Sequence, residues 1–248
     1  MTETVLKPVQ NEAALLIPPR GLLVLADLHI GIEYALYQQG VHVGSRVDLL
    51  VDKVRGIVDE YNVEEMLILG DVKHVVPGSP YSQRRDLLRF FKEFKDLSLH
   101  VVPGNHDGGI HRFIPKNVKI HPSKGWILEE EGIGFVHGHR WPDENVFRCS
   151  TVVAAHTHPS VMLKDKIGYR FFERCWINSK LDVEKARIRY PSALDCDVVF
   201  MPAFNPLCGG LAVNVNGIIG PLGKIVDIDS SEVYLLDGSS LGRVRDLK

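Results

Sequence analysis

Five apolar runs in this chain end in aspartate, asparagine or histidine, and this feature constrains the fold more than any other. In residues 99–108, LHVVPGNHDG, an apolar run stops at Pro103-Gly104, and Asn105, His106 and Asp107 follow at once. Ligands bind at the carboxyl ends of strands in open α/β sheets. One such ending is typical of a turn, but five together predict a metal site. The other four endings are Asp27-x-His29, Gly70-Asp71-x-x-His74, His137-Gly138-His139 and His156-x-His158.

The first half of the chain alternates apolar runs with amphipathic segments. Short continuous apolar runs at 21–26, 66–69 and 99–102 are typical of strands buried on both faces. The segments between them predict helices over 32–39, over 45–61 and after Ser79. Strands alternating with helices predict a mainly parallel sheet. A short hairpin is predicted ahead of it, over 4–9 and 13–17.

Two serines are the predicted helix N-caps, Ser45 and Ser79, the latter followed by a first-turn proline at Pro80. The apolar side of the last helix is predicted to consist of Leu87, Leu88, Phe91 and Phe94. Short β-type runs follow in the second half, at 127–128, 134–136, 151–155, 161–163, 168–172, 198–200, 211–215 and 233–236. They predict a second, mixed or antiparallel sheet. The predicted fold class is α/β, a four-layer αββα sandwich of two mixed sheets flanked by helices.

This sandwich is predicted to be one domain over residues 1–248, in which residues 161–248 complete the second sheet. The composition, 45% hydrophobic and 24% charged, is that of a globular protein. A net charge of −2 gives no bulk attraction to nucleic acid, and no apolar run approaches the roughly 20 residues that cross a bilayer. The four dispersed cysteines form no CxxC pair, which predicts a reducing, cytoplasmic location, and the lack of a long apolar run predicts no membrane association.

The order of the five endings resembles the calcineurin-like metallophosphoesterases, whose pattern is D-x-H, GD, GNH(D/E), H and GHxH. The segments ADLHIGIE, GDVKH, GNHDGG, VHGHRWP, AHTHP and MPAFNPLCGG are similar to the SbcD-related archaeal phosphoesterases. They are similar in turn to the bacterial DNA-ligase-associated metallophosphoesterase. The motifs cover residues 27–158, more than half of the chain. One position departs from the pattern: Ala155 stands where the superfamily usually has glycine.

The resemblance implies a centre of two divalent metal ions. Asp27, His29 and His158 are then expected to hold one ion, and Asn105, His137 and His156 the other. Asp71 is expected to bridge them, because one carboxylate has two oxygens. Two such ions, roughly 3.5–4 Å apart, can hold a hydroxide and clamp phosphoryl oxygens. Imidazole and carboxylate ligands suit transition metals, and the resemblance favours Mn²⁺, with iron, zinc or nickel as alternatives.

The family pattern also implies roles near the reacting phosphate. His106 is expected to stabilise charge or protonate the leaving oxygen, and His74 to act on substrate. Asp107 either orients His106 or is a turn carboxylate, and His139 is either a donor behind the metal ligands or structural. Arg140, followed by Trp141, and Arg112, followed by Phe113, are candidate substrate contacts, with simple packing as the alternative for Trp141. The remaining histidines are expected to be ordinary core or surface residues: His42, His100, His111 and His121.

These features together predict a phosphodiesterase that uses a metal-bound hydroxide without a covalent intermediate. The resemblance implies a nucleic-acid or nucleotide substrate, DNA or RNA, and a DNA-repair helicase or ligase as partner. A small-molecule phosphatase or cyclic-nucleotide phosphodiesterase is the alternative enzyme. The alternative of another class is a non-catalytic scaffold, which is disfavoured because all seven ligand positions and His106 are intact.

Overall fold

The three apolar runs of the first half form the parallel centre of the first sheet. In the computed structural model, which describes residues 6–76 and 80–248, these strands are β3 (Leu22–Ala26), β4 (Glu65–Leu69) and β5 (Ser98–Val102). Ala26 pairs with Leu69, and Leu69 pairs with Val102, so the strands end side by side. The polar residues that follow them therefore leave the sheet at one edge.

Shorter strands complete the first sheet on both sides. The antiparallel strands β1 (Lys7–Pro8) and β2 (Ala14–Ile17) precede β3, and the parallel strand β6 (Lys119–Ile120) follows β5, in the order β1-β2-β3-β4-β5-β6. The predicted hairpin is confirmed within the described residues, while residues 4 and 5 lie outside them.

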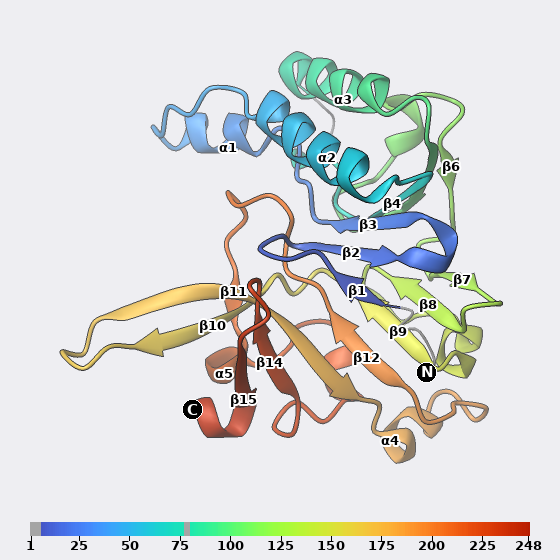
Figure 1. Cartoon of the computed structure of the whole chain (residues 1–248), viewed down its shortest axis with the longest axis vertical. Coiled ribbons are helices and arrows are strands. Elements are labelled where there is room, and N and C mark those ends of the chain that lie inside the picture. The colour runs from blue at the N-terminus through green and yellow to red at the C-terminus, as the bar shows by residue number, and fades with distance from the viewer. Residues whose placement is uncertain (1–5, 77–79) are drawn as a thin grey trace.

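Helices cover the outer face of this sheet (Figure 1). Helices α2 (Val47–Tyr61) and α3 (Tyr81–Glu93) pack over it, and the short helix α1 (Ile32–Gln38) lies beyond them at one side of the molecule. The apolar stripe of α2 is buried with Leu23 and Ile68 of the sheet and Phe91 of α3. This core fixes the strands whose ends carry the polar clusters.

The second sheet is larger and mixed. Its strands run in the order β13 (Leu211–Ala212), β10 (Pro159–Lys164), β11 (Arg170–Lys180), β12 (Asp197–Phe200), β9 (Thr151–Ala154), β8 (Ile133–Val136) and β7 (Trp126–Leu128). Strand β14 (Glu232–Leu235) pairs with β11, and β15 (Ser240–Arg243) pairs with β14. Strands β8 and β9 are parallel, and Val136 pairs with Ala154. Their endings therefore also leave the sheet together.

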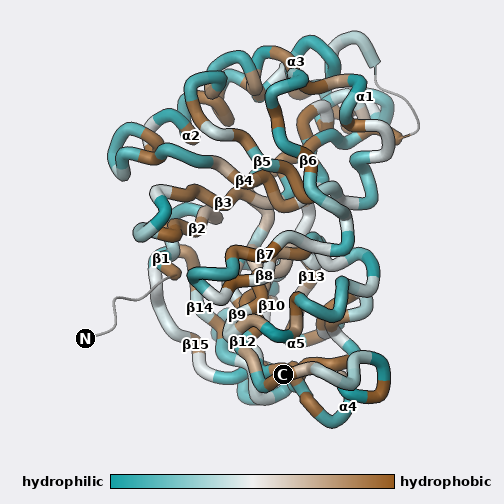
Figure 2. The backbone as a smooth tube through the Cα atoms, turned by 90° about the vertical axis from the view of Figure 1, so that its right-hand side faces the viewer, coloured by the Kyte–Doolittle hydropathy of each residue, from teal (hydrophilic) through white to brown (hydrophobic). Residues whose placement is uncertain are grey.

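The two sheets stack through a shared apolar core. Leu15, Val24 and Leu67 from the first sheet are buried in it with Phe135 and Val153 from the second. A further core lies on the outer face of the second sheet, beneath the short helices α4 (Val183–Arg187) and α5 (Val213–Asn216). Figure 2 shows the stacked sheets, with α2 and α3 beyond one of them and α4 beyond the other. The predicted four-layer αββα architecture is confirmed.

Two predicted strands have the wrong extent. Only Leu211 and Ala212 of the run 211–215 form a strand, and α5 follows at once. The amide of Asn214 explains the change, because its Oδ1 accepts from Met162 N–H at 3.0 Å and its Nδ2 donates to Met162 O at 2.9 Å. The strand predicted over 168–172 is β11, which continues to Lys180.

The helix ends and one helix face also differ from expectation. Arg46, not Ser45, is the N-cap of α2, and Ser45 Oγ instead donates to Asp86 Oδ2 at 2.9 Å. Ser79 lies outside the described residues, and Pro80 precedes α3 rather than starting it. On α3, Leu88 is 53% exposed while Phe90 is buried in the core. No helix of the described residues is long and apolar enough to span a membrane.

Candidate metal centre and active site

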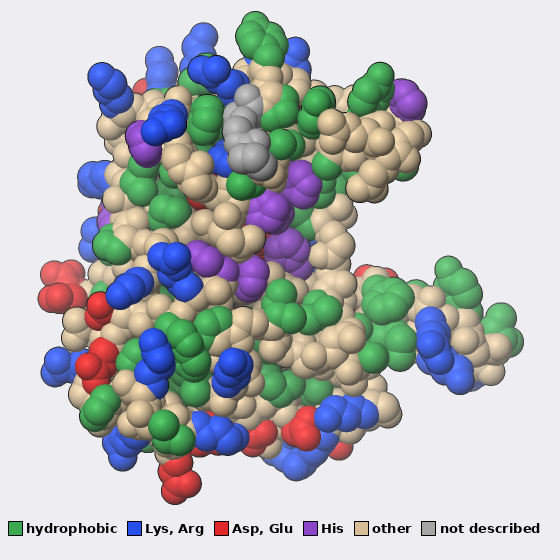
Figure 3. Space-filling model, turned by 180° about the vertical axis from the view of Figure 1, so that it is seen from behind, with side chains coloured by type: hydrophobic (Ala, Val, Ile, Leu, Met, Phe, Trp, Pro, Cys, Tyr) green, Lys and Arg blue, Asp and Glu red, His purple; other side chains and the backbone are tan. Residues whose placement is uncertain are grey.

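The five polar strand endings converge on one place between the two sheets. Strands β3, β4 and β5 of the first sheet deliver Asp27, His29, Asp71, His74, Asn105 and His106, and strands β8 and β9 of the second deliver His137, His156 and His158. Figure 3 shows histidine side chains gathered in the middle of one face of the molecule. The cavity there measures about 270 Å³ and opens to solvent.

Asp71 lies at the centre of this cluster, and its two carboxylate oxygens face different histidines. Oδ2 is 3.5 Å from Nε2 of His29, and Oδ1 is 3.5 Å from Nε2 of His137. The backbone N–H of His106 donates to Oδ1 at 2.8 Å, which fixes the orientation of the carboxylate. Asp71 is therefore placed where one oxygen can serve each of two cation sites.

The residues divide into two groups around Asp71. On one side, potential ligand atoms of Asp27, His29 and Asp71 lie within 4.8 Å of one another, and His158 Nε2 is 3.4 Å from Asp27 Oδ1. This is the group predicted for the first ion.

On the other side, potential ligand atoms of Asp71, His137 and His156 also lie within 4.8 Å of one another. Asn105 Oδ1 is 3.2 Å from His137 Nε2. The structure thus brings together the three residues predicted for the second ion, beside the oxygen of Asp71 that faces away from His29.

Backbone carbonyls orient two of the histidines toward the carboxylates. Nδ1 of His137 donates to the carbonyl oxygen of Leu69 at 3.2 Å, and Nδ1 of His158 donates to that of Gly209 at 3.1 Å. Because a carbonyl only accepts, Nδ1 of each ring carries a proton, and Nε2 is the nitrogen that faces the carboxylates and would bind a cation once it is deprotonated. Such backbone bonds orient metal-binding histidines in proteins.

The buried carboxylate of Asp27 tests whether this donor set fits a cation. Its Oδ1 is fully buried and has no hydrogen-bond partner among the described residues, although Nε2 of His158 faces it. A buried carboxylate oxygen that accepts no hydrogen bond is unfavourable unless a positive charge, from a cation or a protonated imidazole, lies beside it. Oxygen and imidazole donors gathered in this way fit divalent transition metals.

The backbone at this site is in an uncommon conformation. Positive φ angles occur at Asp27 (55°), His29 (42°), Asp71 (44°), His156 (70°) and His158 (45°). The left-handed region is unfavourable for residues with a Cβ and costs of order 1–3 kcal/mol for each residue. The surrounding fold holds these turns, and they aim alternate side chains into one cavity.

Two glycines allow the strand endings to approach so closely. A Cβ on Gly70 would lie 2.0 Å from His137 Nδ1, and a Cβ on Gly104 would lie 2.2 Å from Asp71 Oδ1. Only a residue without a side chain fits at either position. The glycines of GD and GNH are therefore required by the contact between the strand endings.

The electrostatics of the cluster favour ionised carboxylates and mostly neutral rings. Burial lowers the pKa of His29 to about 3 and that of His156 to about 4. Burial opposes ionisation of Asp71, but the hydrogen bond and the charge of His137, with the N–H of His106, together outweigh it and hold the pKa of Asp71 well below its usual range. Burial also opposes protonation of His137, yet Asp71 and Asp27 raise its pKa to about 9. Without a bound cation, a proton on His137 therefore balances part of the negative charge of Asp71 and Asp27.

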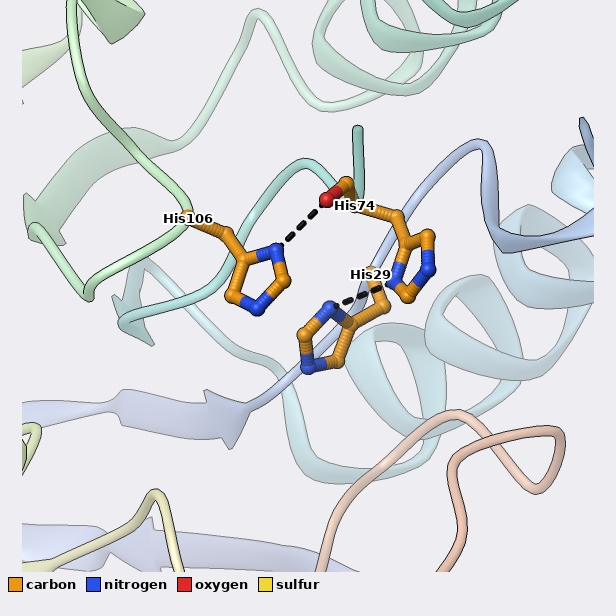
Figure 4. Close-up of side chains that lie close together, drawn as sticks. All are labelled: His29, His74 and His106. Atoms are coloured by element: carbon orange, nitrogen blue, oxygen red, sulfur yellow. Dashed lines mark hydrogen bonds between the residues drawn. The ribbon is translucent and has the colours of Figure 1, made fainter. Parts of the chain in front are cut away.

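His29, His74 and His106 form a second cluster at the rim of the cavity (Figure 4). His74 Nδ1 is 3.1 Å from His29 Nδ1, so one ring donates to the other. His106 donates from Nδ1 to the carbonyl oxygen of His74, and its Nε2 points to the cavity, 3.9 Å from Asp71 Oδ2. Both rings remain partly exposed, as groups that meet a substrate must be.

Asp107 lies behind the cavity and not in it. Its buried carboxylate accepts from the backbone N–H of Gly104 at 2.9 Å and from that of Lys73 at 3.2 Å. Burial raises the pKa of Asp107. These contacts join the GNH loop to the GD loop, and they support the turn-carboxylate interpretation over direct orientation of His106.

The three predicted substrate contacts are not among the described residues that line the cavity. Arg140 is exposed and its Nη1 donates to Ser123 Oγ at 2.9 Å. Arg112 is exposed at the end of a short 3₁₀ helix. His139 is half-buried, with its ring centroid 5.2 Å from that of His137 and burial lowering its pKa to about 4. The guanidinium of Arg189 lies over the Trp141 ring, with Cζ 4.7 Å from the ring centroid. This contact supports packing, the alternative role predicted for Trp141.

Sequence reasoning missed several residues of the site. Cys208 is buried in the cavity wall with its Sγ near His29 and His158, and Gly209 supplies the carbonyl that orients His158. Lys73, in the GD loop, is fully buried, and its backbone N–H donates to Asp107 of the GNH loop. The segment MPAFNPLCGG already contained a signal for Cys208, whereas Lys73 has none, because a lysine is seldom fully buried.

The fold and this cluster together define a metal-dependent hydrolase of phosphate esters. The model of the calcineurin-like phosphoesterase family matches residues 21–184, and the chain belongs to that family. The predicted resemblance is thereby confirmed. No curated protein sequence matches the chain.

Two solved structures are similar to this chain. The Pseudomonas putida nuclease MPE is 19% identical, with a TM-score of 0.58 over 96% of this chain and 99% of that one. YfcE, a phosphoesterase from E. coli, is 17% identical, with a TM-score of 0.39 over 90% of this chain and 97% of that one. At such identities the first comparison establishes a shared fold alone.

Proposed function

We propose that this protein is a binuclear metal-dependent phosphodiesterase acting on nucleic acids. The observation that carries the proposal is the position of Asp71, whose oxygens face His29 on one side and His137 on the other, each at 3.5 Å. A bridging carboxylate between two sets of ligands is the arrangement that two-metal phosphoesterases require.

The ligand roles follow the two groups in the cavity. Asp27, His29 and His158 would hold one ion, Asn105, His137 and His156 the other, and Asp71 both. Cys208 Sγ lies beside the first group and could add a soft donor there. Bound divalent cations supply Lewis-acid activation of a water molecule and of the phosphoryl oxygens. Imidazole, amide and carboxylate donors together favour Mn²⁺, with iron, zinc and nickel as alternatives.

His106 and His74 would act on the phosphoryl group and not on the metals. The Nδ1–H of His106 is used by the carbonyl of His74, so Nε2 is the atom that donates to or accepts from substrate. This nitrogen lies on the open side of Asp71, within reach of a leaving oxygen. Protonation of that oxygen, or a hydrogen bond to its developing charge, is the help a histidine gives in this position.

A nucleic-acid substrate is favoured over a small-molecule monoester or a cyclic nucleotide. The related fold of Pseudomonas putida belongs to a protein described as a nuclease, which supports a diester substrate. The open mouth of the cavity also admits a polymer more easily than an enclosed pocket would. The cytoplasmic location stays a prediction from the cysteine pattern, and a repair helicase or ligase partner stays a prediction from the resemblance.

The test is Mn²⁺-dependent hydrolysis of bis(p-nitrophenyl) phosphate by wild type and by Asp71→Asn. Turnover that disappears in the variant, together with two bound Mn²⁺ per wild-type chain, is expected. Asp59→Asn, on the exposed surface of α2, is the matched control and should retain activity. No turnover by a chain that holds two ions would overturn the phosphodiesterase proposal. Full activity with one ion would overturn its binuclear form.

A further inference from the structure

The hairpin formed by β10 and β11 projects from the second sheet as a free arm. The two strands pair continuously from Ser160–Arg174 to Lys164–Arg170, and residues 165–169 form the turn. Figure 1 shows the ribbon extending well beyond the other strands of the sheet. Its outer part carries large exposed side chains, with Ile167 91%, Tyr169 67% and Phe172 60% exposed. Exposed apolar side chains that gather on one projecting element mark a candidate contact surface.

One face of the arm combines cations with apolar groups. Directly paired residues in an antiparallel sheet share a face, so Lys164 lies beside Arg170 and Met162 beside Phe172. We call these four residues the arm face; none of them is acidic. Trp176 lies on the same face of β11 farther along and is buried in the core between the sheets. The arm face therefore looks toward the side of the first sheet, where α1 lies.

The arm and α1 both begin at the active site. Strand β10 starts at the residue after His158, and α1 starts at Ile32, which lines the site cavity. Both elements extend to the same side of the molecule in Figure 1. Helix α1 adds exposed aromatic groups of its own, Tyr34 at 37% and Tyr37 at 57% exposure. In Figure 3 the histidine cluster lies at the inner end of the recess between these two projections.

We propose that the arm face binds a single strand of nucleic acid and leads it into the metal centre, which rests on the proposed phosphodiesterase function. Single strands are bound by aromatic side chains that stack on bases and by cations that follow the phosphates. Phe172 supplies the stacking surface, and Lys164 and Arg170 supply the charge. The overall charge of −2 does not oppose this, because the arm face is a local group of cations without a carboxylate.

A second copy of the chain is a less suitable occupant. A two-fold contact places the same patch on both partners. It would therefore bring Lys164 and Arg170 of one arm toward those of the other, and like charges facing each other are unfavourable. A polyanion meets the same residues with complementary charge.

The test measures binding of a short fluorescein-labelled thymidine oligonucleotide with phosphorothioate linkages to the Mn²⁺-loaded protein by fluorescence anisotropy. Phe172→Ala should raise Kd roughly tenfold, the loss expected for one stacked base. Replacing Lys164 and Arg170 together by alanine should reduce the slope of log Kd against log salt concentration by about 0.7 for each cation removed. Phe171→Ala is the matched control, because Phe171 is the neighbouring aromatic on the opposite face of the hairpin and should bind as wild type.

A second measurement compares substrates of different length. In Phe172→Ala, the ratio of kcat/KM for an oligonucleotide to kcat/KM for bis(p-nitrophenyl) phosphate should fall about tenfold. Wild-type binding by both arm-face variants, or an equal loss in Phe171→Ala, would overturn the proposal. So would a wild-type dimer that Phe172→Ala converts to monomer in light scattering, since the second copy would then be the occupant.

The two proposals fail separately. If the arm-face variants lose oligonucleotide binding while the wild type hydrolyses neither substrate, the arm proposal stands and the phosphodiesterase proposal fails. If the wild type hydrolyses both substrates and the variants bind normally, the arm proposal alone fails.

Discussion

The imidazole rings of His106 and His74 stack with their centroids 5.4 Å apart and 20° between their planes. The chain also joins them directly, because Nδ1 of His106 donates to the carbonyl oxygen of His74 at 2.5 Å. This contact fixes the tautomer of His106 and leaves Nε2 toward the cavity. A ring held in this way is oriented for proton transfer before any substrate arrives.

His106→Ala should keep both metal sites and lose activity. The backbone N–H that orients Asp71 remains in the variant, so the carboxylate keeps its position. Removal of a general acid lowers kcat by about 10²–10⁴. Metal content by elemental analysis and kcat for bis(p-nitrophenyl) phosphate check this. Loss of metal from the variant would show that the ring is a ligand.

Gly104→Ala should disrupt the metal centre. The added Cβ would meet Asp71 Oδ1 at 2.2 Å and the Asp71 backbone nitrogen at 2.5 Å, so the two loops must separate. Overpacking of this kind lowers the free energy of unfolding by about 1–3 kcal/mol. Urea unfolding in EDTA and calorimetric Mn²⁺ titration measure both effects. Gly108→Ala, in the same loop with nothing within 4 Å of its Cβ, is the control and should change neither.

Asp107→Asn should destabilise the fold. An amide has one accepting oxygen and one donating nitrogen, so the N–H of Gly104 or that of Lys73 would lose its acceptor. A buried N–H without an acceptor lowers the free energy of unfolding by about 1–3 kcal/mol, which urea unfolding can measure. Asp165 is an exposed turn carboxylate that also accepts two backbone N–H groups, so Asp165→Asn should lower the free energy of unfolding by less. Unchanged stability with an altered pH profile of kcat would instead favour orientation of His106 by Asp107.

His100 and His121 should make stability depend on pH. Their rings stack with Trp126, and His100 Nδ1 lies 2.8 Å from His121 Nε2. Burial lowers the pKa of His121 to about 4, from 6.5 in the unfolded chain, and burial also lowers that of His100. Between pH 4 and pH 6.5 the unfolded state therefore binds more protons than the folded state. The contribution of the two neutral rings to the free energy of unfolding is complete above pH 6.5 and is lost as the pH falls toward 4.

The check compares the free energy of unfolding at pH 7 and pH 4.5 in wild type and in His121→Gln. The variant should lose part of the acid destabilisation, because one of the two groups no longer titrates. His111→Gln, at an exposed position, is the control and should behave as wild type. An identical pH dependence in all three chains would contradict the prediction.

The sequence by itself determined the elements that carry the site. Continuous apolar runs such as 22–26 are typical of strands buried on both faces, and the abrupt change to aspartate and histidine after them marks the functional edge. Residue type then determined the chemistry, since imidazole and carboxylate donors gathered at one edge bind transition metals. The family and its four-layer architecture followed from the same residues.

Local pattern failed where contacts distant in the chain decide the conformation. The run 211–215 has the composition of a strand, yet Asn214 turns back to bond the Met162 backbone and a helix forms. His100 showed no pattern that linked it to His121, because His100 lies on β5, His121 follows β6, and the two residues meet only where these strands pair. The projection of the β10–β11 arm depends likewise on where the second sheet ends.

Only the tertiary structure decided how the ligands meet. Asp27, Asp71 and His156 take left-handed backbone angles, which residues with a Cβ adopt only at a cost in free energy. Contacts across the molecule hold them there: the N–H of His156 donates to Asp27 Oδ2 at 3.3 Å, and the N–H of His106 donates to Asp71 Oδ1. Local sequence therefore supplies the ligands and the strands that present them, while the stacking of the two sheets supplies the energy that holds their backbone in a conformation that binds metal.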